Sequence, residues 1–213
     1  PRSTSSAASD VYKRQETGAE VVIPHYRLAP ESPWPAAIDD GFSVFKEMSS
    51  EPLALVGESA GGNLCLTLIL RAFQLGIRLP QAAAFLSPWC DLSNAGPSVV
   101  NNDGRDPALS AQHIDFAANY YVGEHDPTNP MISPIYGVFD KSFPPSIIST
   151  GSRDLLMSQA MGLRDVLKDN NVPVELCLWK DLWHVFEWDY RLPESSESIR
   201  QISNWLQRYM PNF

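Results

Sequence analysis

The sequence predicts an α/β protein with a mostly parallel sheet and helices on both faces. Short apolar runs rich in β-branched residues alternate with longer segments whose apolar residues recur at helical spacing. A glycine-rich turn, GESAGGN, follows one apolar run and opens an apolar helix. Alternation of this kind predicts parallel strands covered on both faces, with ligands bound beyond the carboxyl ends of the strands.

Composition limits the possible functions. The chain has 213 residues, which suits one domain or most of one, and its net charge of −9 argues against a nucleic-acid partner. No apolar run is long enough to predict a membrane span. Three widely spaced cysteines, Cys65, Cys90 and Cys177, fit free thiols in a reducing, cytoplasmic setting better than disulfides or a metal site. The sequence does not reveal an oligomeric state.

Residues 1–15 differ from the rest of the chain. They are rich in serine and have neither a hydrophobic period nor the apolar stretch of a signal peptide. We interpret them as a non-native scar resembling translated adapter sequence, with a natural disordered tail as the alternative. The expected folded part is then a partial domain over residues 16–213.

The first elements follow in order. Ala19–His25 is predicted to be a buried strand, because it is apolar and rich in valine and isoleucine. Pro33–Met48 has apolar residues at helical spacing with a proline near its start. Leu53–Val56 is a second predicted strand, and the helix of residues 60–75 ends at Gly76.

The second half continues the alternation. Residues 88–134 form a long polar segment with one expected helix, Ser110–Val122, for which Ser110 is a suitable N-cap. The other expected elements are the strands Ala82–Ser87, Ser146–Thr150 and Val174–Trp179 and the helices Ser158–Asn170 and Glu194–Tyr209.

A candidate nucleophile lies between the second strand and its helix. Residues 57–61 read G-x-S-x-G, in the context expected of a nucleophile elbow that raises the hydroxyl of Ser59 above the sheet. Gly57 and Gly61 are expected to give room to the turn, and Gly62 to allow close helix packing. The backbone N–H of Ala60, at a helix N-terminus, can stabilise an oxyanion. The alternative interpretation of Ser59 is a helix N-cap.

A serine nucleophile needs a base and an acid. Of four histidines, His25, His113, His125 and His184, the last lies just past the final strand, although a histidine between Trp and Val is also compatible with core filling. Asp154 directly follows a strand, and the order Ser59, Asp154, His184 matches the chain order of one hydrolase class. The alternative for Asp154 is a turn carboxylate. The rival acids are Asp165, Asp169, Asp181 and Glu187, which lie inside a helix or too near His184.

Several motifs together resemble the hormone-sensitive-lipase-like carboxylesterases, which have the α/β-hydrolase fold. They are YRLAPE at residues 26–31, PAA at 35–37, GESAGGN at 57–63, SPWCDL at 87–92, Asp106-Pro107, Ser133-Pro134 and WHVF at 183–186. The resemblance covers about residues 16–210. GSRDLL at 151–156 is similar to the subgroup of monoterpene ε-lactone hydrolases.

The resemblance implies a catalytic triad of Ser59, Asp154 and His184, acting on small-molecule esters or lactones without a cofactor. It also implies that residues 26–31 are structural. Trp89 and Phe186 are candidates for the wall of the substrate pocket. A non-enzymatic binding protein and a serine peptidase of the same fold remain the alternatives.

The chain departs from the family pattern at its start. The resemblance implies an HGGG-type oxyanion loop and early strands upstream of YRLAPE, and a cap over the pocket. The given sequence has neither the loop nor the early strands, and much of the cap is absent too. We therefore expect a chain shortened at its N-terminus, lacking the early strands and the oxyanion segment. Only Ala60 would then donate to the oxyanion, and we expect this chain to have low activity.

Overall fold

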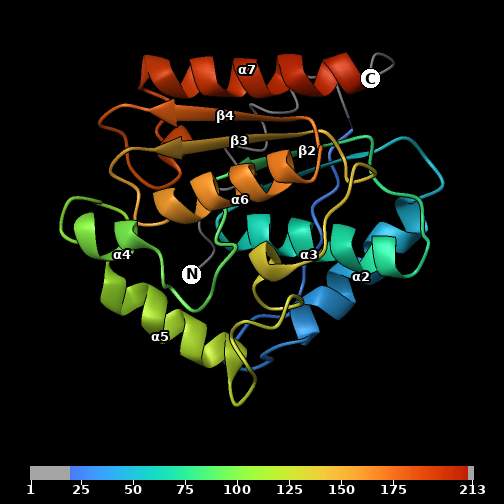
Figure 1. Cartoon of the computed structure of the whole chain (residues 1–213), viewed down its shortest axis with the longest axis horizontal. Helices are drawn as coiled ribbons and strands as arrows, with labels where there is room; N and C mark the ends of the chain where they lie inside the picture. The colour runs from blue at the N-terminus through green and yellow to red at the C-terminus, as the bar shows by residue number, and fades with distance from the viewer. Residues whose placement is uncertain (1–19, 211–213) are drawn as a thin grey trace.

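The computed structural model describes residues 20–210, which contain a four-stranded sheet. Figure 1 shows this sheet between layers of helices. The strands are β1 (Ala54–Glu58), β2 (Ala82–Leu86), β3 (Ser146–Gly151) and β4 (Val174–Trp179). They pair in this order, and every pair is parallel. All four carboxyl ends therefore reach the same edge of the sheet, as the sequence predicted for a functional site.

Helices cover both faces of the sheet, as expected. In Figure 1, α7 (Pro193–Tyr209) lies on one side, and α3 (Ala60–Gln74) and α6 (Met157–Asp169) lie on the other. The alternation of side chains along β2 explains this arrangement. Ala82, Ala84 and Leu86 pack with α7, whereas Ala83 and Phe85 pack with the cluster that contains α3 and α6.

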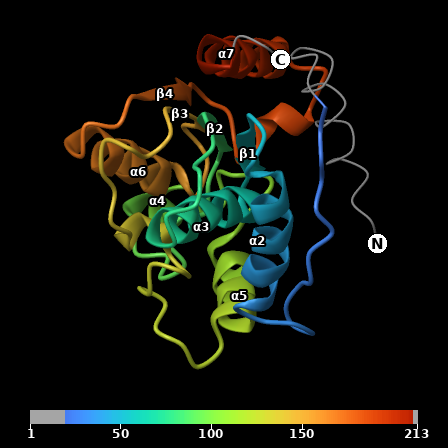
Figure 2. The same cartoon turned by 90° about the vertical axis from the view of Figure 1, so that its right-hand side faces the viewer.

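The helix α2 (Ala36–Met48) packs against α3 and extends the core at the β1 side (Figure 2). Its buried residues Ile38, Phe42 and Phe45 meet Leu64 and Leu68 of α3. The helix that carries the candidate nucleophile at its start is therefore held between the sheet and a second layer.

The predicted strand at Ala19–His25 is wrong for the residues that the structure describes. Residues 20–25 form no strand, and Val22 and Ile23 are 48% and 56% exposed. A strand forms only with a hydrogen-bonded neighbour, and none of the four strands pairs with this segment. The apolar pattern identified a segment that requires a partner, and residues 20–210 do not supply one.

The polar segment 88–134 contains more structure than expected. The predicted helix is present as α5 (Ala111–Val122), and the Ser110 side chain accepts a hydrogen bond from the His113 N–H. A second, short helix, α4 (Pro97–Asn101), begins with a proline. Five residues are too few to show a helical period, which explains why the sequence did not predict it.

Two short 3-10 helices complete the described chain: η1 (Pro134–Tyr136) and η2 (Phe186–Trp188). Cys65 and Cys90 are buried free thiols, and Cys177 is a half-buried free thiol. Within residues 20–210, no helix is long and apolar enough to cross a membrane. The expected tail of residues 1–15 lies outside the described residues.

Candidate active site

Ser59 occupies a strained turn between β1 and α3. Its φ of 54° and ψ of −118° are unusual for a residue with a side chain. The backbone is fixed from both directions: the Ser59 N–H donates to the Leu86 carbonyl at 2.9 Å, and the Ser59 carbonyl accepts from the Trp89 N–H at 3.1 Å. The turn at the end of β1 is therefore attached to the end of β2, its neighbour in the sheet.

The glycines around Ser59 differ in what they permit. A Cβ at Gly57 would lie 2.3 Å from the Gly61 carbonyl oxygen, so only glycine fits there. A Cβ at Gly62 would approach Pro88 to 3.0 Å, which fits the expected close packing. At Gly61 a Cβ would meet nothing within 4 Å, so the expectation that this glycine gives room is wrong. The space needed by the turn lies on the Gly57 side.

Asp154 follows β3 and is completely buried. Its carboxylate accepts hydrogen bonds from the Thr150 hydroxyl at 2.9 Å and the Leu156 N–H at 2.8 Å. Burial alone would raise the pKa of Asp154, but the charge of His184 and the hydrogen bonds that Asp154 accepts from His184, Ser87 and Leu156 outweigh it and lower the pKa below 3.8. The side chain is therefore an ionised carboxylate at neutral pH.

His184 connects Asp154 to Ser59. Its Nδ1 lies 3.1 Å from Asp154 Oδ1, and its Nε2 lies 2.9 Å from Ser59 Oγ. With the Nδ1 proton donated to the carboxylate, Nε2 presents its lone pair to the serine hydroxyl. The imidazole is only 4% exposed.

The surroundings of His184 favour its protonated form. Burial alone would lower the pKa of His184, but the charge and hydrogen bond of Asp154, with added negative charge from Asp106 and Glu187, raise it above 6.5. The neighbouring Val185 has a φ of 46°, and its N–H donates to the Ser87 hydroxyl at 3.0 Å. The base is therefore positioned by a strained, buried segment after β4.

The structure brings together only one set of the candidate residues. His125 packs against Trp34, with ring centroids 4.5 Å apart, and His113 lies in α5. Asp165 and Asp169 lie in α6. Glu187 is buried, but it accepts hydrogen bonds from two serine hydroxyls, those of Ser149 and Ser198, at 2.6 and 2.8 Å.

The expected oxyanion and pocket residues have different environments. Ala60 is the first residue of α3, where backbone N–H groups have no partner within the helix. Trp89 is half-buried, and its indole N–H donates to Asn94 at 2.9 Å. Phe186 is completely buried against Trp179, so among residues 20–210 it does not face an open pocket, and its expected place in a pocket wall stays a prediction. Phe186, two residues after His184, packs in the hydrophobic core.

Two supporting residues were not predicted as part of the site. Ser87 follows β2, and its hydroxyl accepts the N–H of Val185, the residue after His184. Its position at the end of a strand is the sequence signal that could have identified it as part of the site. Asp106 accepts hydrogen bonds from the backbone N–H groups of Leu155 and His184. The sequence marked Asp106 only as part of a family motif. Among residues 20–210, no group of three or more His, Cys, Asp or Glu could hold a metal ion.

Comparisons with known proteins show that this chain is similar to α/β hydrolases. The family model for the alpha/beta hydrolase fold matches residues 8–188. An acetyl-hydrolase of Streptomyces hygroscopicus is 32% identical, and the match covers 97% of this chain and 69% of that protein. An esterase of Acinetobacter venetianus is 28% identical, with 89% of this chain and 64% of that protein covered.

Solved structures of esterases are also similar to this chain. The crystal structure of an esterase from the bacterial hormone-sensitive lipase family superimposes with a TM-score of 0.89 at 30% identity. It matches 93% of this chain and 69% of that chain. The present chain therefore spans about two thirds of the length of the proteins that it resembles.

Proposed function

The chain belongs to the hormone-sensitive-lipase-like carboxylesterases of the α/β-hydrolase fold, and from this premise we propose that it cleaves esters through an acyl-enzyme on Ser59. The observation that carries the proposal is the continuous contact from Ser59 Oγ to His184 Nε2 and from His184 Nδ1 to Asp154 Oδ1, at 2.9 and 3.1 Å. These are the distances at which a base can remove a serine proton.

In the first half of the reaction, Ser59 Oγ attacks the acyl carbon of the ester while His184 Nε2 takes the hydroxyl proton. Negative charge develops on the former carbonyl oxygen, where the N–H of Ala60 can donate a hydrogen bond. The tetrahedral intermediate then releases the alcohol, which takes its proton from His184. The acyl group stays on Ser59 as an ester.

In the second half, water attacks the acyl-enzyme. His184 removes a proton from the water and returns it to Ser59, which frees the carboxylic acid. Asp154 keeps the imidazole in the tautomer with the proton on Nδ1 and stabilises the imidazolium that forms twice in each cycle. The lowered pKa of Asp154 fits this role, since the side chain must stay ionised.

We propose esters with small to medium acyl groups as the substrates, and lactones as the alternative. The relative from Streptomyces hygroscopicus is named an acetyl-hydrolase, which favours the short end of this range. Rates with p-nitrophenyl acetate, p-nitrophenyl octanoate and an ε-lactone would rank the classes. A peptide p-nitroanilide in the same series would test the peptidase alternative.

The identity of the nucleophile is best tested by single-turnover labelling. Ala60 is the one oxyanion donor that the elbow motif provides, and the loss of one such donor costs about 10²–10³ in turnover. A fluorophosphonate needs only one attack, so it reports on Ser59 even where steady-state turnover is low. We expect the 213-residue chain to gain one covalent label, located at Ser59 by peptide mass mapping.

The Ser59→Ala variant should remove this label. A matched control is Ser43→Ala, because Ser43 is an exposed serine of α2 and should leave labelling unchanged. Labelling that persists in folded Ser59→Ala, or that maps to another serine, would reject the assignment.

A further inference from the structure

Asp106 belongs to the Asp106-Pro107 motif, to which the steps of the proposed acyl transfer assign no role. It is only 6% exposed, although it lies in a loop between α4 and α5. A carboxylate buried in a loop needs hydrogen-bond donors. The distribution of these donors indicates what the residue does.

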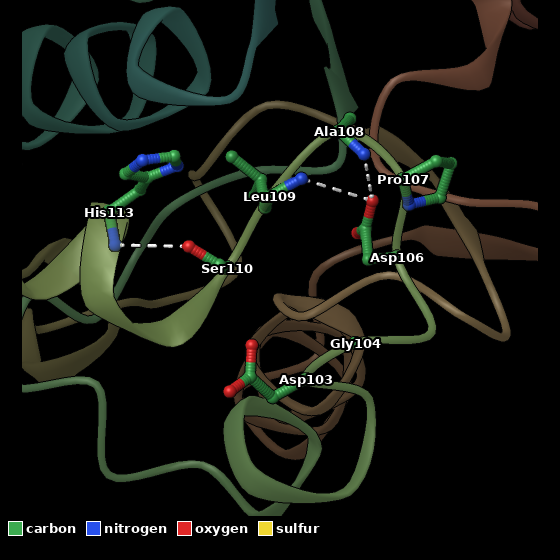
Figure 3. Close-up of a pocket in the computed structure, with 8 residues that line it drawn as sticks. All are labelled: Asp103, Gly104, Asp106, Pro107, Ala108, Leu109, Ser110 and His113. Carbon is green, nitrogen blue, oxygen red and sulfur yellow. Dashed lines mark hydrogen bonds between the residues drawn. The ribbon is translucent and has the colours of Figure 1, made fainter.

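The carboxylate of Asp106 accepts four backbone N–H groups. Oδ1 accepts from Ala108 at 2.8 Å and from Leu109 at 3.2 Å, both in its own loop (Figure 3). Oδ2 accepts from Leu155 at 3.1 Å and from His184 at 3.3 Å. Oδ1 therefore stabilises the loop, and Oδ2 joins two segments that are distant from the loop in sequence.

The two segments joined by Oδ2 carry the proposed acid and base. Leu155 directly follows Asp154, and the second donor is the backbone N–H of His184 itself. Since one oxygen atom accepts both N–H groups, it restrains the distance between the two backbones. That distance sets the contact between His184 Nδ1 and Asp154 Oδ1.

The rest of the loop strengthens the same attachment. The Asn102 side chain donates to the carbonyls of Ser152 and Asp154 at 3.2 and 2.9 Å. The Arg153 guanidinium donates to the Arg105 carbonyl. Residues 102–106 therefore contact residues 152–155, the turn that carries Asp154, at several points. Among residues 102–106, only Asp106 also accepts a hydrogen bond from His184.

We propose that Asp106 is a positioning residue for the acid–base pair: its carboxylate fixes His184 relative to Asp154 and adds negative charge beside the imidazole. The proposal rests on the proposed function, because it assigns the task of Asp106 in that reaction. A carboxylate is required, since an amide would place an NH₂ group against two of the four N–H donors. The charged groups that face His184 are Asp154, Asp106 and Glu187.

The first test compares two aspartates of one loop. Asp103 and Asp106 both line a depression of about 440 Å³ (Figure 3). Asp103 is exposed, and its carboxylate accepts the Ala111 N–H at 3.0 Å. Asp106→Asn and Asp103→Asn therefore make the same chemical change, but only the first touches the acid–base pair.

We expect Asp106→Asn to slow fluorophosphonate labelling of Ser59 by about 10- to 100-fold, because small displacements of reacting groups have effects of this size. Asp103→Asn should label at the wild-type rate.

The pH dependence of labelling separates a positioning role of Asp106 from a general effect on stability. Loss of the Asp106 charge should lower the pKa of His184, so the acidic limb of the labelling rate should move to lower pH. An NMR titration of the imidazole should show the same shift without any reaction.

Where Asp106→Asn does not unfold cooperatively, Asp106→Glu takes its place. Glutamate keeps the charge but moves the carboxylate by one methylene, so labelling should slow while the pH limb stays in place. A folded variant of either kind that labels at the wild-type rate with an unchanged pH profile overturns the proposal. Failure of Ser59→Ala to abolish labelling would instead reject the proposed function, so the two failures are distinguishable.

Discussion

The acid–base side of the site and the nucleophile side are built differently. Asp154 and His184 are buried, and they contact Ser87 after β2, the end of β3 and the loop that carries Asp106. The nucleophile side has less cover within residues 20–210. Among these residues β1 pairs only with β2, and the segment with Val22 and Ile23 is exposed and forms no strand.

The difference shows that two kinds of interaction hold one site. Buried charges and their hydrogen bonds set the positions of the acid and base, whereas backbone geometry sets the position of Ser59. The positions of the acid and base should therefore be sensitive to the loss of a charge. The tight turns on both sides of the site should be sensitive to the addition of a methyl group. Three predictions test this distinction, beginning with the largest effect.

Asp154→Asn should have the largest effect. Asparagine keeps the shape of the side chain but removes the charge that fixes the imidazole tautomer and stabilises the imidazolium. We expect the rate constant for fluorophosphonate labelling of Ser59 to fall by about 10⁴-fold, as in serine hydrolases that lose this charge. The measurement is the second-order labelling rate at pH 8, with a thermal melt to show that the variant is folded.

Glu187→Gln is the matched control, since Glu187 is also a buried carboxyl. Burial raises the pKa of Glu187 above 4.5, and its hydrogen bonds from Ser149 and Ser198 do not offset this effect. We expect labelling within about tenfold of wild type, because glutamine keeps an oxygen that can accept the hydroxyls of Ser149 and Ser198 and the change does not touch the hydrogen bond between His184 and Asp154.

The same control gives a pH signature in stability. A raised pKa means that the folded state holds the proton more tightly, so this stabilisation is present below pH 4.5 and is lost as pH rises through the folded-state pKa. Glutamine does not titrate, and the unfolding free energy of Glu187→Gln should therefore fall less over this interval. Equal slopes in the two proteins would show that Glu187 does not titrate in this way.

Two glycine substitutions should have the next largest effect, one on each side of the site. A Cβ at Gly57 would lie 2.3 Å from the Gly61 carbonyl oxygen, and a Cβ at Gly151 would lie 2.2 Å from that of Leu182. Both neighbours are backbone atoms that cannot rotate away. We expect Gly57→Ala and Gly151→Ala each to lower the free energy of unfolding by about 1–3 kcal/mol, measured by urea denaturation.

Gly61→Ala is the control for these two variants. A Cβ there would meet nothing within 4 Å, and alanine favours the helix by about 0.5–1 kcal/mol over glycine. We expect Gly61→Ala to be at least as stable as the wild-type protein. Destabilisation of Gly61→Ala equal to that of Gly57→Ala would contradict the view that steric contact, rather than glycine content, shapes the turn.

Local patterns in the sequence predicted the parallel sheet and the residues at its carboxyl ends. Each such signal depends on neighbours in the chain: an apolar run, a glycine turn, or a polar residue just after a strand. Ser59, Asp154 and His184 all belong to this class, and the structure places them in contact. Whether they act as a triad remains a prediction for the labelling experiments.

Features that depend on distant partners could not be predicted in this way. The segment Ala19–His25 has the composition of a strand, but pairing requires a neighbour in space. The sequence did not predict that Phe186 packs in the core against Trp179. The contacts of Asp106 join positions 49 and 78 residues away, which no local pattern encodes.

The smallest expected effect concerns a direct contact between the two sides of the site. The Trp188 indole N–H, just after the base segment, donates to Glu58 at the end of β1, with 2.6 Å between Nε1 and Oε2. Because this hydrogen bond is exposed, Trp188→Phe should lower the free energy of unfolding by only about 1 kcal/mol. Glu58→Gln, which keeps an acceptor oxygen, should change the free energy of unfolding less.

Urea denaturation measures these changes in stability. Fluorophosphonate labelling of Trp188→Phe should stay within about fivefold of wild type, the equivalent of 1 kcal/mol. A loss of a hundredfold or more would mean that this exposed contact, rather than the buried carboxylates, aligns Ser59 with His184.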